Sequence, residues 1–232
     1  MKSVAEIHQP VLAEVCADLL APALDFAPDA ATPLPSTADF RSIQGPVLVD
    51  ATLGLGGHSA YLLERHPQLR IIGIDRDPQA RRLAASRLSA FANRLSIAGT
   101  TYGELDSVLA QHGLSQVEGI LADLGVSSLQ LDEAERGFAY AQPEAPLDMR
   151  MNQTAGFTAA DFLNLAEAEE IAAVLHTYGE EKFSWPIAKA IVKARLDQPL
   201  QVSGQLVEII RDTIPAPARR SGGNPAKRTF QA

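Results

Sequence analysis

The chain has a single cysteine among its 232 residues, so it can form neither an internal disulfide nor a cysteine-rich metal site. Cys16 lies in an apolar stretch, which favours a buried small side chain over a catalytic thiol. Long apolar runs are also lacking. None approaches the ~20 residues that span a bilayer, and the start at Met1 has no apolar stretch typical of a signal peptide. We therefore expect a cytoplasmic protein that does not bind membranes.

Positive charge is scarce as well. The chain has 20 Lys and Arg residues against 28 Asp and Glu residues, which gives a net charge of −8. This balance excludes a surface that is basic all over and binds nucleic acid indiscriminately. The region 211–232 is an exception, because it holds five basic residues and one acidic residue. The residues alone leave open whether this tail is a solvated end or an arm that binds phosphates.

What the chain does have is the composition of an ordinary globular protein, with 46% hydrophobic and 21% charged residues. In its first half, short apolar segments alternate with segments of helical periodicity. This alternation predicts an α/β fold with a doubly wound parallel sheet. The expected strands cover 46–50, 69–75, 94–98 and 117–123, and the helices between them cover 59–66, 78–91 and 104–112.

The segments around this alternation differ in character. We expect an amphipathic helix over 10–20 and then a proline-rich surface insertion over 21–44. After Gly125 the periodicity is helical only, and we assign Trp185 to the packing of this helical part. The predicted division is an α/β domain at 1–130, a helical subdomain at 131–215 and a basic arm at 216–232. The helices of the subdomain are expected over 157–165, 167–178, 184–196 and 202–214.

A glycine-rich turn follows the first expected strand. The segment Asp50-Ala-Thr-Leu-Gly-Leu-Gly-Gly-His58 lies where this strand passes into a helix, and glycine lets the backbone come close to a ligand. Such a loop can also be no more than a tight turn. Asp75 ends the second strand, 21 residues after Gly54, where a carboxylate can accept both hydroxyls of an adenosine ribose or, as an alternative, cap the next helix. The pairing of loop and acid favours a ligand that contains adenosine.

Two classes of adenosine ligand use such parts. A nicotinamide dinucleotide fingerprint would want glycine where this chain has Ser59, and His58 intrudes where a pyrophosphate would lie. S-adenosylmethionine has no phosphate, and acids at the ends of the first two strands fit its amino-acid and ribose groups. Asp123 ends the fourth strand and points to the same crevice, because the carboxyl ends of parallel strands face the ligand. Ser127 and Ser128 after it either contact a substrate or cap the next helix.

A series of motifs in order along the chain resembles the bacterial ribosomal RNA small-subunit methyltransferase H family. The resemblance covers nearly all of the chain outside 21–44. The motifs are His8-Gln-Pro-Val-Leu, Asp50-Ala-Thr-Leu-Gly-Leu-Gly-Gly-His58, Ile74-Asp-Arg-Asp-Pro78, Asp123-Leu-Gly-Val-Ser-Ser-Leu-Gln-Leu-Asp132, Glu135-Arg-Gly-Phe138, Pro146-Leu-Asp-Met-Arg-Met151, Tyr178-Gly-Glu-Glu-Lys182 and Lys227-Arg-Thr-Phe-Gln-Ala232.

The resemblance implies an enzyme that uses S-adenosylmethionine to methylate the exocyclic N4 of one cytidine in 16S ribosomal RNA of the small ribosomal subunit. It also implies a Rossmann-like methyltransferase sheet into which a helical, substrate-recognising subdomain is inserted. In such a site Asp75 would bind the ribose and Tyr102, otherwise a core aromatic, would lie against the adenine. The implied residues around the methyl donor are Gly56, Gly57, His58, Asp75, Tyr102, Asp123 and Gln130.

Several points of the chemistry stay open at this stage. Asp123 is our candidate for the group that accepts a proton from the amine, and a role in donor binding alone is equally defensible. The unstacked base could be gripped by four residues that have ordinary structural alternatives, namely Arg136, Phe138, Tyr140 and Arg150. No second ligand is spaced to join His58, so we expect no catalytic metal.

The family continues through further strands after the position of Ala232, so the resemblance suggests a C-terminally truncated chain with an incomplete sheet. Three hypotheses follow. The first is the ribosomal RNA methyltransferase, with a homodimer left open. The second is a module that binds the donor or the ribosome without activity. The third is an amino-methylating DNA enzyme, although Asp123-Leu-Gly-Val stands where such enzymes usually carry an Asp/Asn-Pro-Pro-aromatic segment.

Overall fold

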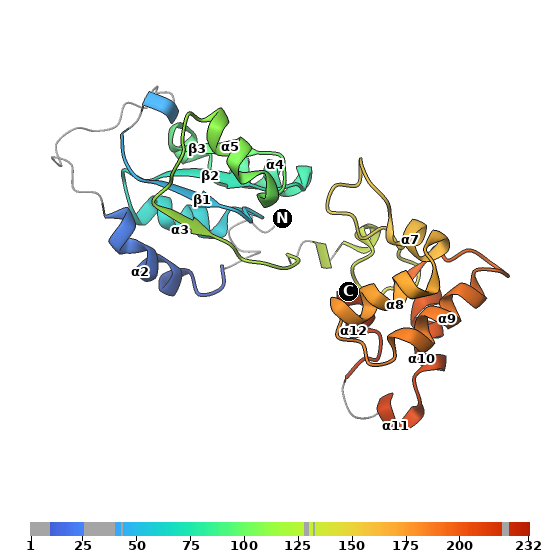
Figure 1. Cartoon of the computed structure of the whole chain (residues 1–232). Coiled ribbons are helices and arrows are strands. Elements are labelled where there is room, and N and C mark those ends of the chain that lie inside the picture. The colour runs from blue at the N-terminus through green and yellow to red at the C-terminus, as the bar shows by residue number, and fades with distance from the viewer. Residues whose placement is uncertain (1–9, 26–39, 43, 128–129, 132, 220–222) are drawn as a thin grey trace. The chain divides into compact units, whose positions relative to one another are not determined.

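The structure, a computed structural model, describes residues 10–25, 40–42, 44–127, 130–131, 133–219 and 223–232. The chain divides into two compact units, Met1–Gly125 and Val126–Ala232 (Figure 1). This division lies a few residues before the boundary expected from the sequence. Each unit has its own hydrophobic core and is described by itself.

The first unit is built on a sheet of four parallel strands in the order β3-β2-β1-β4. This Rossmann-like α/β arrangement confirms the fold class that the sequence predicts. The strands are β1 (Val47–Asp50), β2 (Arg70–Ile74), β3 (Leu95–Ala98) and β4 (Gly119–Leu121). Because β2 and β3 lie on one side of β1 and β4 lies on the other, the chain reverses its direction of winding between β1 and β4.

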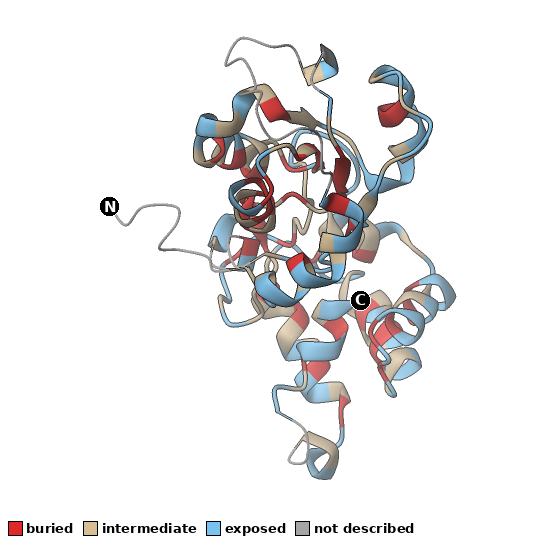
Figure 2. Cartoon of the chain, turned by 90° about the vertical axis from the view of Figure 1, so that its left-hand side faces the viewer, coloured by how far each residue is buried: buried red, intermediate tan, exposed pale blue. Residues whose placement is uncertain are grey.

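Among the described residues of this unit, four α-helices cover the two faces of the sheet: α2 (Ala13–Leu24), α3 (Gly57–Arg65), α4 (Pro78–Arg87) and α5 (Leu105–Gln111). Successive strand residues point to opposite faces. Leu48 and Ile71 pack with α2, α3 and α4, whereas Val49 and Ile72 pack with α5. Figure 1 shows α3 and α5 on opposite sides of the sheet, and Figure 2 marks the buried residues. These strands are buried on both faces, so the carboxyl edge of the sheet is where polar side chains can meet a ligand.

The first helix differs from its prediction. Helix α2 begins at Ala13 instead of residue 10 and continues to Leu24, through Pro22, into the expected insertion. Pro22 lies in the last turn, where its missing N–H removes a single helical hydrogen bond. Leu24 is 2% exposed in the core, and burial of a leucine contributes about 1.5–3 kcal/mol, which offsets that loss. Cys16 is half-buried against the same core.

Only part of the proline-rich segment 21–44 can be compared with its prediction as a surface insertion. Residues 26–39 and 43 lie outside the described residues. A short 3₁₀ turn, η1 (Phe40–Ser42), follows them. The Phe40 ring meets the His112 ring edge to face, with 5.4 Å between centroids, and packs against the core on the α5 side of the sheet. The Phe40 side chain therefore fixes the end of the insertion to the sheet, while Arg41 and Gln44 are exposed.

A buried arginine closes the carboxyl end of α3. Arg94 is 8% exposed and its guanidinium donates hydrogen bonds to the carbonyl oxygens of Leu63, His66 and Leu69, each at 3.0 Å. Burial lowers the pKa of Arg94 from its ordinary value. The bond to Leu63 satisfies a carbonyl in the last turn of α3, and the bonds to His66 and Leu69 hold the connection between α3 and β2.

Replacing Arg94 by leucine should lower the free energy of unfolding of the first unit by at least about 2 kcal/mol, because buried carbonyls lose a charged donor. Urea denaturation followed by circular dichroism measures this change. Trp185 belongs to the second unit, so its fluorescence transition should stay where it is in the unaltered protein. The exposed Arg82 on α4, replaced by leucine, is the matched control. Equal stability of the two variants would contradict the assignment.

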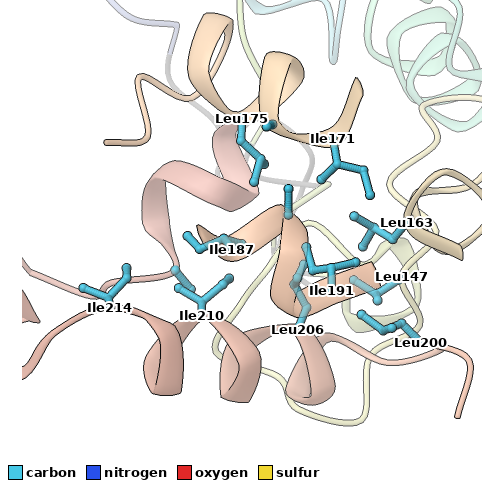
Figure 3. Packing of buried hydrophobic residues seen from close by; sticks show 13 residues of the cluster. Leu147, Leu163, Ile171, Leu175, Ile187, Ile191, Leu200, Leu206, Ile210 and Ile214 are labelled. Atoms are coloured by element: carbon cyan, nitrogen blue, oxygen red, sulfur yellow. The ribbon is translucent and has the colours of Figure 1, made fainter. Parts of the chain in front are cut away.

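The second unit is helical, as the periodicity predicts. Ile171, Ile187, Ile191, Leu206 and Ile210 lie together in its core (Figure 3). No helix in the described part of the chain is both long and apolar enough to cross a membrane. The helices are α7 (Ala159–Leu165), α8 (Ala168–Thr177), α9 (Ser184–Ala194), α10 (Ser203–Thr213), α11 (Ala216–Arg219) and α12 (Lys227–Gln231).

Two features of this unit differ from expectation. Trp185, which we assigned to the packing of the helical part, is 45% exposed and is not part of its core cluster, so that assignment is wrong. The end of the basic tail is packed rather than solvated. Ala226 and Thr229 are buried, and the Phe230 ring meets Tyr140 edge to face at 5.9 Å between centroids. The core of the helical unit therefore extends to α12.

Candidate functional site at the carboxyl edge of the sheet

The carboxyl ends of β1 and β4 meet where the winding of the sheet reverses. In open α/β sheets, ligands bind in the crevice outside such a switch point. Two hydrogen bonds join the strand ends here. The Ala51 N–H donates to the Leu121 carbonyl at 2.8 Å, and the Asp123 N–H donates to the Thr52 Oγ1 at 2.7 Å. The backbone of Asp123 is therefore fixed to the β1 loop, and Asp123 itself is exposed.

A second set of bonds joins the β1 loop to the end of β2. The Gly54 N–H donates to Asp75 Oδ2 and the Asp77 N–H donates to Asp75 Oδ1, both at 2.8 Å. Gly54 has a φ of +52°, a left-handed conformation that glycine adopts at low cost. A carboxylate can accept about four hydrogen bonds, so each oxygen of Asp75 can accept one more from a ligand hydroxyl. Burial raises the pKa of Asp75, and the two backbone donors act in the opposite direction.

The acid at the end of β1 is engaged inside the protein. Asp50 is 1% exposed, its Oδ2 accepts the Ser59 hydroxyl at 2.6 Å, and its Oδ1 accepts the Thr52 N–H at 3.3 Å. Burial raises the pKa of Asp50 more than these bonds lower it. The sequence suggested that this acid faces the ligand. The structure instead makes it the support that fixes the glycine loop to α3.

The loop residues Gly56, Gly57 and His58 lie at the start of α3 and make close internal contacts. Gly56 has a φ of +71°, and an added Cβ would lie 2.8 Å from the side chain of Leu88. A Cβ on Gly57 would lie 3.3 Å from Pro10, and the His58 Nε2 lies 2.9 Å from the Val11 carbonyl oxygen. These residues hold the loop against α4 and against the chain before α2. Their contact with a donor stays a prediction.

The two remaining predicted donor contacts lie in different units. Tyr102, in a 3₁₀ turn after β3, is 59% exposed, so it is not the core aromatic that its sequence position alone would suggest. Gln130 is 5% exposed in the second unit, where its Oε1 accepts the Ser127 N–H at 2.8 Å. Ser127 therefore has a partner within the protein, whereas Ser128 lies outside the described residues. Contact of Gln130 with a donor is not tested by this geometry.

Three of the four residues proposed to grip a base have structural partners in the second unit. Arg136 is 3% exposed and donates to the Met151 carbonyl at 2.8 Å. Arg150 forms two bonds to Asp148, at 3.0 and 2.7 Å, and this guanidinium lowers the pKa of the Asp148 carboxyl. Tyr140 packs on Phe230, as described above. The structure therefore favours the ordinary interpretation of these residues.

Comparison with known proteins places the chain. The MraW methylase family matches it over residues 5–232, which is nearly the whole chain. The chain belongs to the MraW methylase family. In the part of the chain that the structure describes, no three His, Cys, Asp or Glu side chains lie together in a group that could hold a metal ion.

Relatives of this MraW family chain share about half of its residues. A protein of Beutenbergia cavernae is 54% identical over 98% of the chain, one of Pseudarthrobacter chlorophenolicus is 49% identical over the whole chain, and one of Streptomyces avermitilis is 50% identical over 97%. Each is named ribosomal RNA small subunit methyltransferase H. The matched parts are 63%, 66% and 65% of those proteins, so the chain spans less than two thirds of their length. The comparisons confirm the resemblance drawn from the motifs.

Two side chains of this MraW site escaped the sequence analysis. Thr52 and Ser59 supply the hydroxyl groups that join β4 to the loop and the loop to α3. Both are small polar residues in a glycine-rich turn, where the sequence alone suggests only loop chemistry. A buried carboxylate needs donors, so an acid at the end of an apolar strand could have pointed to the hydroxyl of Ser59. The partner of the Thr52 hydroxyl is a backbone N–H distant in the sequence, for which the sequence holds no signal.

Replacing Thr52 by valine should free the Asp123 N–H while leaving the loop backbone in place. In the unaltered protein this amide should exchange slowly with solvent, and in Thr52→Val its exchange should be at least about tenfold faster because its acceptor is gone. Thr52→Ser retains the hydroxyl and should keep the slow exchange. Hydrogen exchange followed by NMR measures all three. Fast exchange of this amide in the unaltered protein would refute the role of Thr52.

Proposed function

We propose that the chain binds S-adenosylmethionine at the carboxyl ends of β1, β2 and β4, and that the protein methylates the exocyclic N4 of a cytidine in 16S ribosomal RNA. The observation that carries this proposal is the pair of bonds Gly54 N–H to Asp75 and Asp123 N–H to Thr52. They hold the three strand ends in one arrangement at the switch point. The name that the relatives carry supports ribosomal RNA of the small subunit as the substrate, which would place the protein in the cytoplasm.

The carboxyl edge fits an adenosine without phosphates. Asp75 offers one further acceptor position on each oxygen, which suits the two neighbouring hydroxyls of a ribose. Tyr102 offers an exposed ring at the end of β3 for an adenine. Gly56 and Gly57 pack closely against Leu88 and Pro10, which holds the glycine loop in one conformation at the start of α3. S-adenosylmethionine, when bound, supplies a methyl group on a positively charged sulfur.

In this proposal the Asp123 carboxylate accepts a proton from the cytosine amino group. The amino nitrogen of cytosine is a weak nucleophile, because its lone pair is delocalised into the ring. A carboxylate that accepts one N–H increases the electron density on nitrogen and takes the proton as the nitrogen–methyl bond forms and the sulfur–methyl bond breaks. Such general-base assistance is worth ~10²–10⁴ in rate. The Thr52 bond fixes the backbone of Asp123, which is the positional control that this step requires.

Two measurements test the proposal. Titration calorimetry with S-adenosylhomocysteine should show binding at one site. The protein should then transfer labelled methyl groups into small ribosomal subunits that lack the modification, and not into duplex DNA. Binding without transfer would leave only a donor-binding module, and the absence of both would overturn the proposal. Transfer into DNA would favour the amino-methylating DNA enzyme instead.

A further inference from the structure

The outward side of α9 carries the only tryptophan in the chain. Trp185 is 45% exposed, although a large apolar ring is usually covered when it serves packing alone. The Nζ of Lys189 lies 5.7 Å from the centre of the Trp185 ring. This distance is within the range of a cation–π interaction, so any group that meets the ring also meets a positive charge.

A second lysine continues the same face. Trp185, Lys189 and Lys193 are spaced by four residues, which places them one above the other along a helix. Both lysines are exposed, and α9 (Ser184–Ala194) contains no acidic residue. In the part of the chain that the structure describes, no salt bridge involves Lys189 or Lys193. The positive charge on this face is therefore available to a ligand.

The opposite side of α9 fixes the direction in which this face points. Ile187, Ala188 and Ile191 are fully buried in the core of the helical unit, as Figure 3 shows for the two isoleucines. Acidic residues border this face, and the exposed Asp197 lies four residues after Lys193, beyond the end of α9. Glu208 and Asp212 of α10 line a hollow of about 400 Å³ next to α9. A polyanion on the basic face would be repelled from that hollow and would run along α9.

We propose that this face, formed by Trp185, Lys189 and Lys193, binds single-stranded RNA. Unpaired bases stack on exposed aromatic rings, and lysines beside the ring contact the phosphates between those bases. The proposal rests on the proposed function for its substrate class and names the surface that holds the RNA. A protein partner could also bury a tryptophan. We favour RNA because the exposed Lys189 and Lys193 complement phosphates, and their effect can be measured as a salt dependence.

The tryptophan itself reports on the proposal. Because Trp185 is the only tryptophan, titration of the whole chain with a short single-stranded oligocytidylate should quench its fluorescence. Heparin, a polyanion without bases, should bind by charge and leave the ring without a stacked base. Quenching by the oligonucleotide and not by heparin supports stacking. No quenching by the oligonucleotide, or equal quenching by both, overturns the proposal.

Variants separate the ring from the charges, with binding followed by the anisotropy of a labelled oligonucleotide. Trp185→Ala should weaken binding roughly 5- to 100-fold. Lys189→Ala and Lys193→Ala should each reduce the slope of log affinity against log salt by about 0.7. Arg82→Ala on α4 makes the same change in charge outside this face and should match the unaltered protein. Unchanged affinity in Trp185→Ala would overturn the proposal.

A separate readout keeps this inference apart from the proposed function. Calorimetric binding of S-adenosylhomocysteine should be the same in Trp185→Ala and in the unaltered protein, because the donor site belongs to the first unit. Loss of RNA binding with intact donor binding supports the α9 surface. Intact RNA binding in Trp185→Ala contradicts it, whatever the donor measurement shows.

Discussion

Asp75→Ala should lower the affinity for S-adenosylhomocysteine by roughly 100-fold or more. Hydrogen bonds to a charged group contribute about 1.5–3 kcal/mol each, and the variant loses two of them to the ribose. It also loses the acceptor that holds the Gly54 N–H, so the glycine loop is no longer fixed to the end of β2. Titration calorimetry on the unaltered protein and the variant measures the difference.

Asp77 provides the control for this prediction. It lies two residues further on, and its side chain accepts the Gln79 N–H at 2.9 Å as the cap of α4. Asp77→Ala should therefore cost about 1 kcal/mol of stability while leaving donor affinity nearly unchanged. If Asp75→Ala bound the donor product as well as Asp77→Ala does, Asp75 would not be the ribose ligand.

Asp123→Asn should reduce the single-turnover rate of methyl transfer by ~10²–10⁴ at saturating donor, because an amide cannot take the proton from the amine. The substitution preserves the size of the side chain and the backbone N–H that Thr52 accepts. Donor affinity should consequently change little. Quenched-flow transfer of labelled methyl groups into unmethylated small subunits gives the rate.

Asp106→Asn is the matched control, since it removes a negative charge from an exposed position on α5. It should transfer at the normal rate. Weak donor binding with normal transfer at saturation in Asp123→Asn would make Asp123 a donor ligand only. Normal behaviour in both respects would remove it from the site.

The two central strands, β1 and β2, could be predicted because they are buried on both faces. Such strands read as short apolar runs, and β1, β2 and β3 lie within the runs predicted for them. The last strand is shorter than its run. Expected over 117–123, β4 covers only Gly119–Leu121, because the Asp123 N–H turns to the hydroxyl of Thr52 instead of a strand neighbour.

The errors lie where tertiary packing overrides a local pattern. Pro22 reads as the end of a helix, yet burial of Leu24 extends α2 beyond it. The sequence of α9 predicts that Trp185 packs in the core, since periodicity gives this helix an apolar side. Periodicity does not show whether the tryptophan ring lies on that side. The tail reads as charged, yet Phe230 and Tyr140 pack its last helix.

The site follows the same division. Asp75 and Asp123 could be found because the ends of parallel strands meet at one edge, a consequence of topology alone. The bonds that hold them could not. The Thr52 hydroxyl accepts the Asp123 N–H at 2.7 Å, from a residue 71 positions away. The Ser59 hydroxyl donates to Asp50 at 2.6 Å, across the glycine-rich turn. Asp50 shows best what the sequence cannot predict. The same acid could face a ligand or support the loop, and its burial in the structure shows that it supports the loop.

A crystal structure of the chain with S-adenosylhomocysteine tests the account most directly. Both ribose hydroxyls should lie within hydrogen-bond distance of the two carboxylate oxygens of Asp75, with the adenine near Tyr102 and the sulfur on the side of Asp123. A ligand bound away from the carboxyl ends of β1 and β2, or an Asp75 that makes no contact with its ribose, would contradict the account.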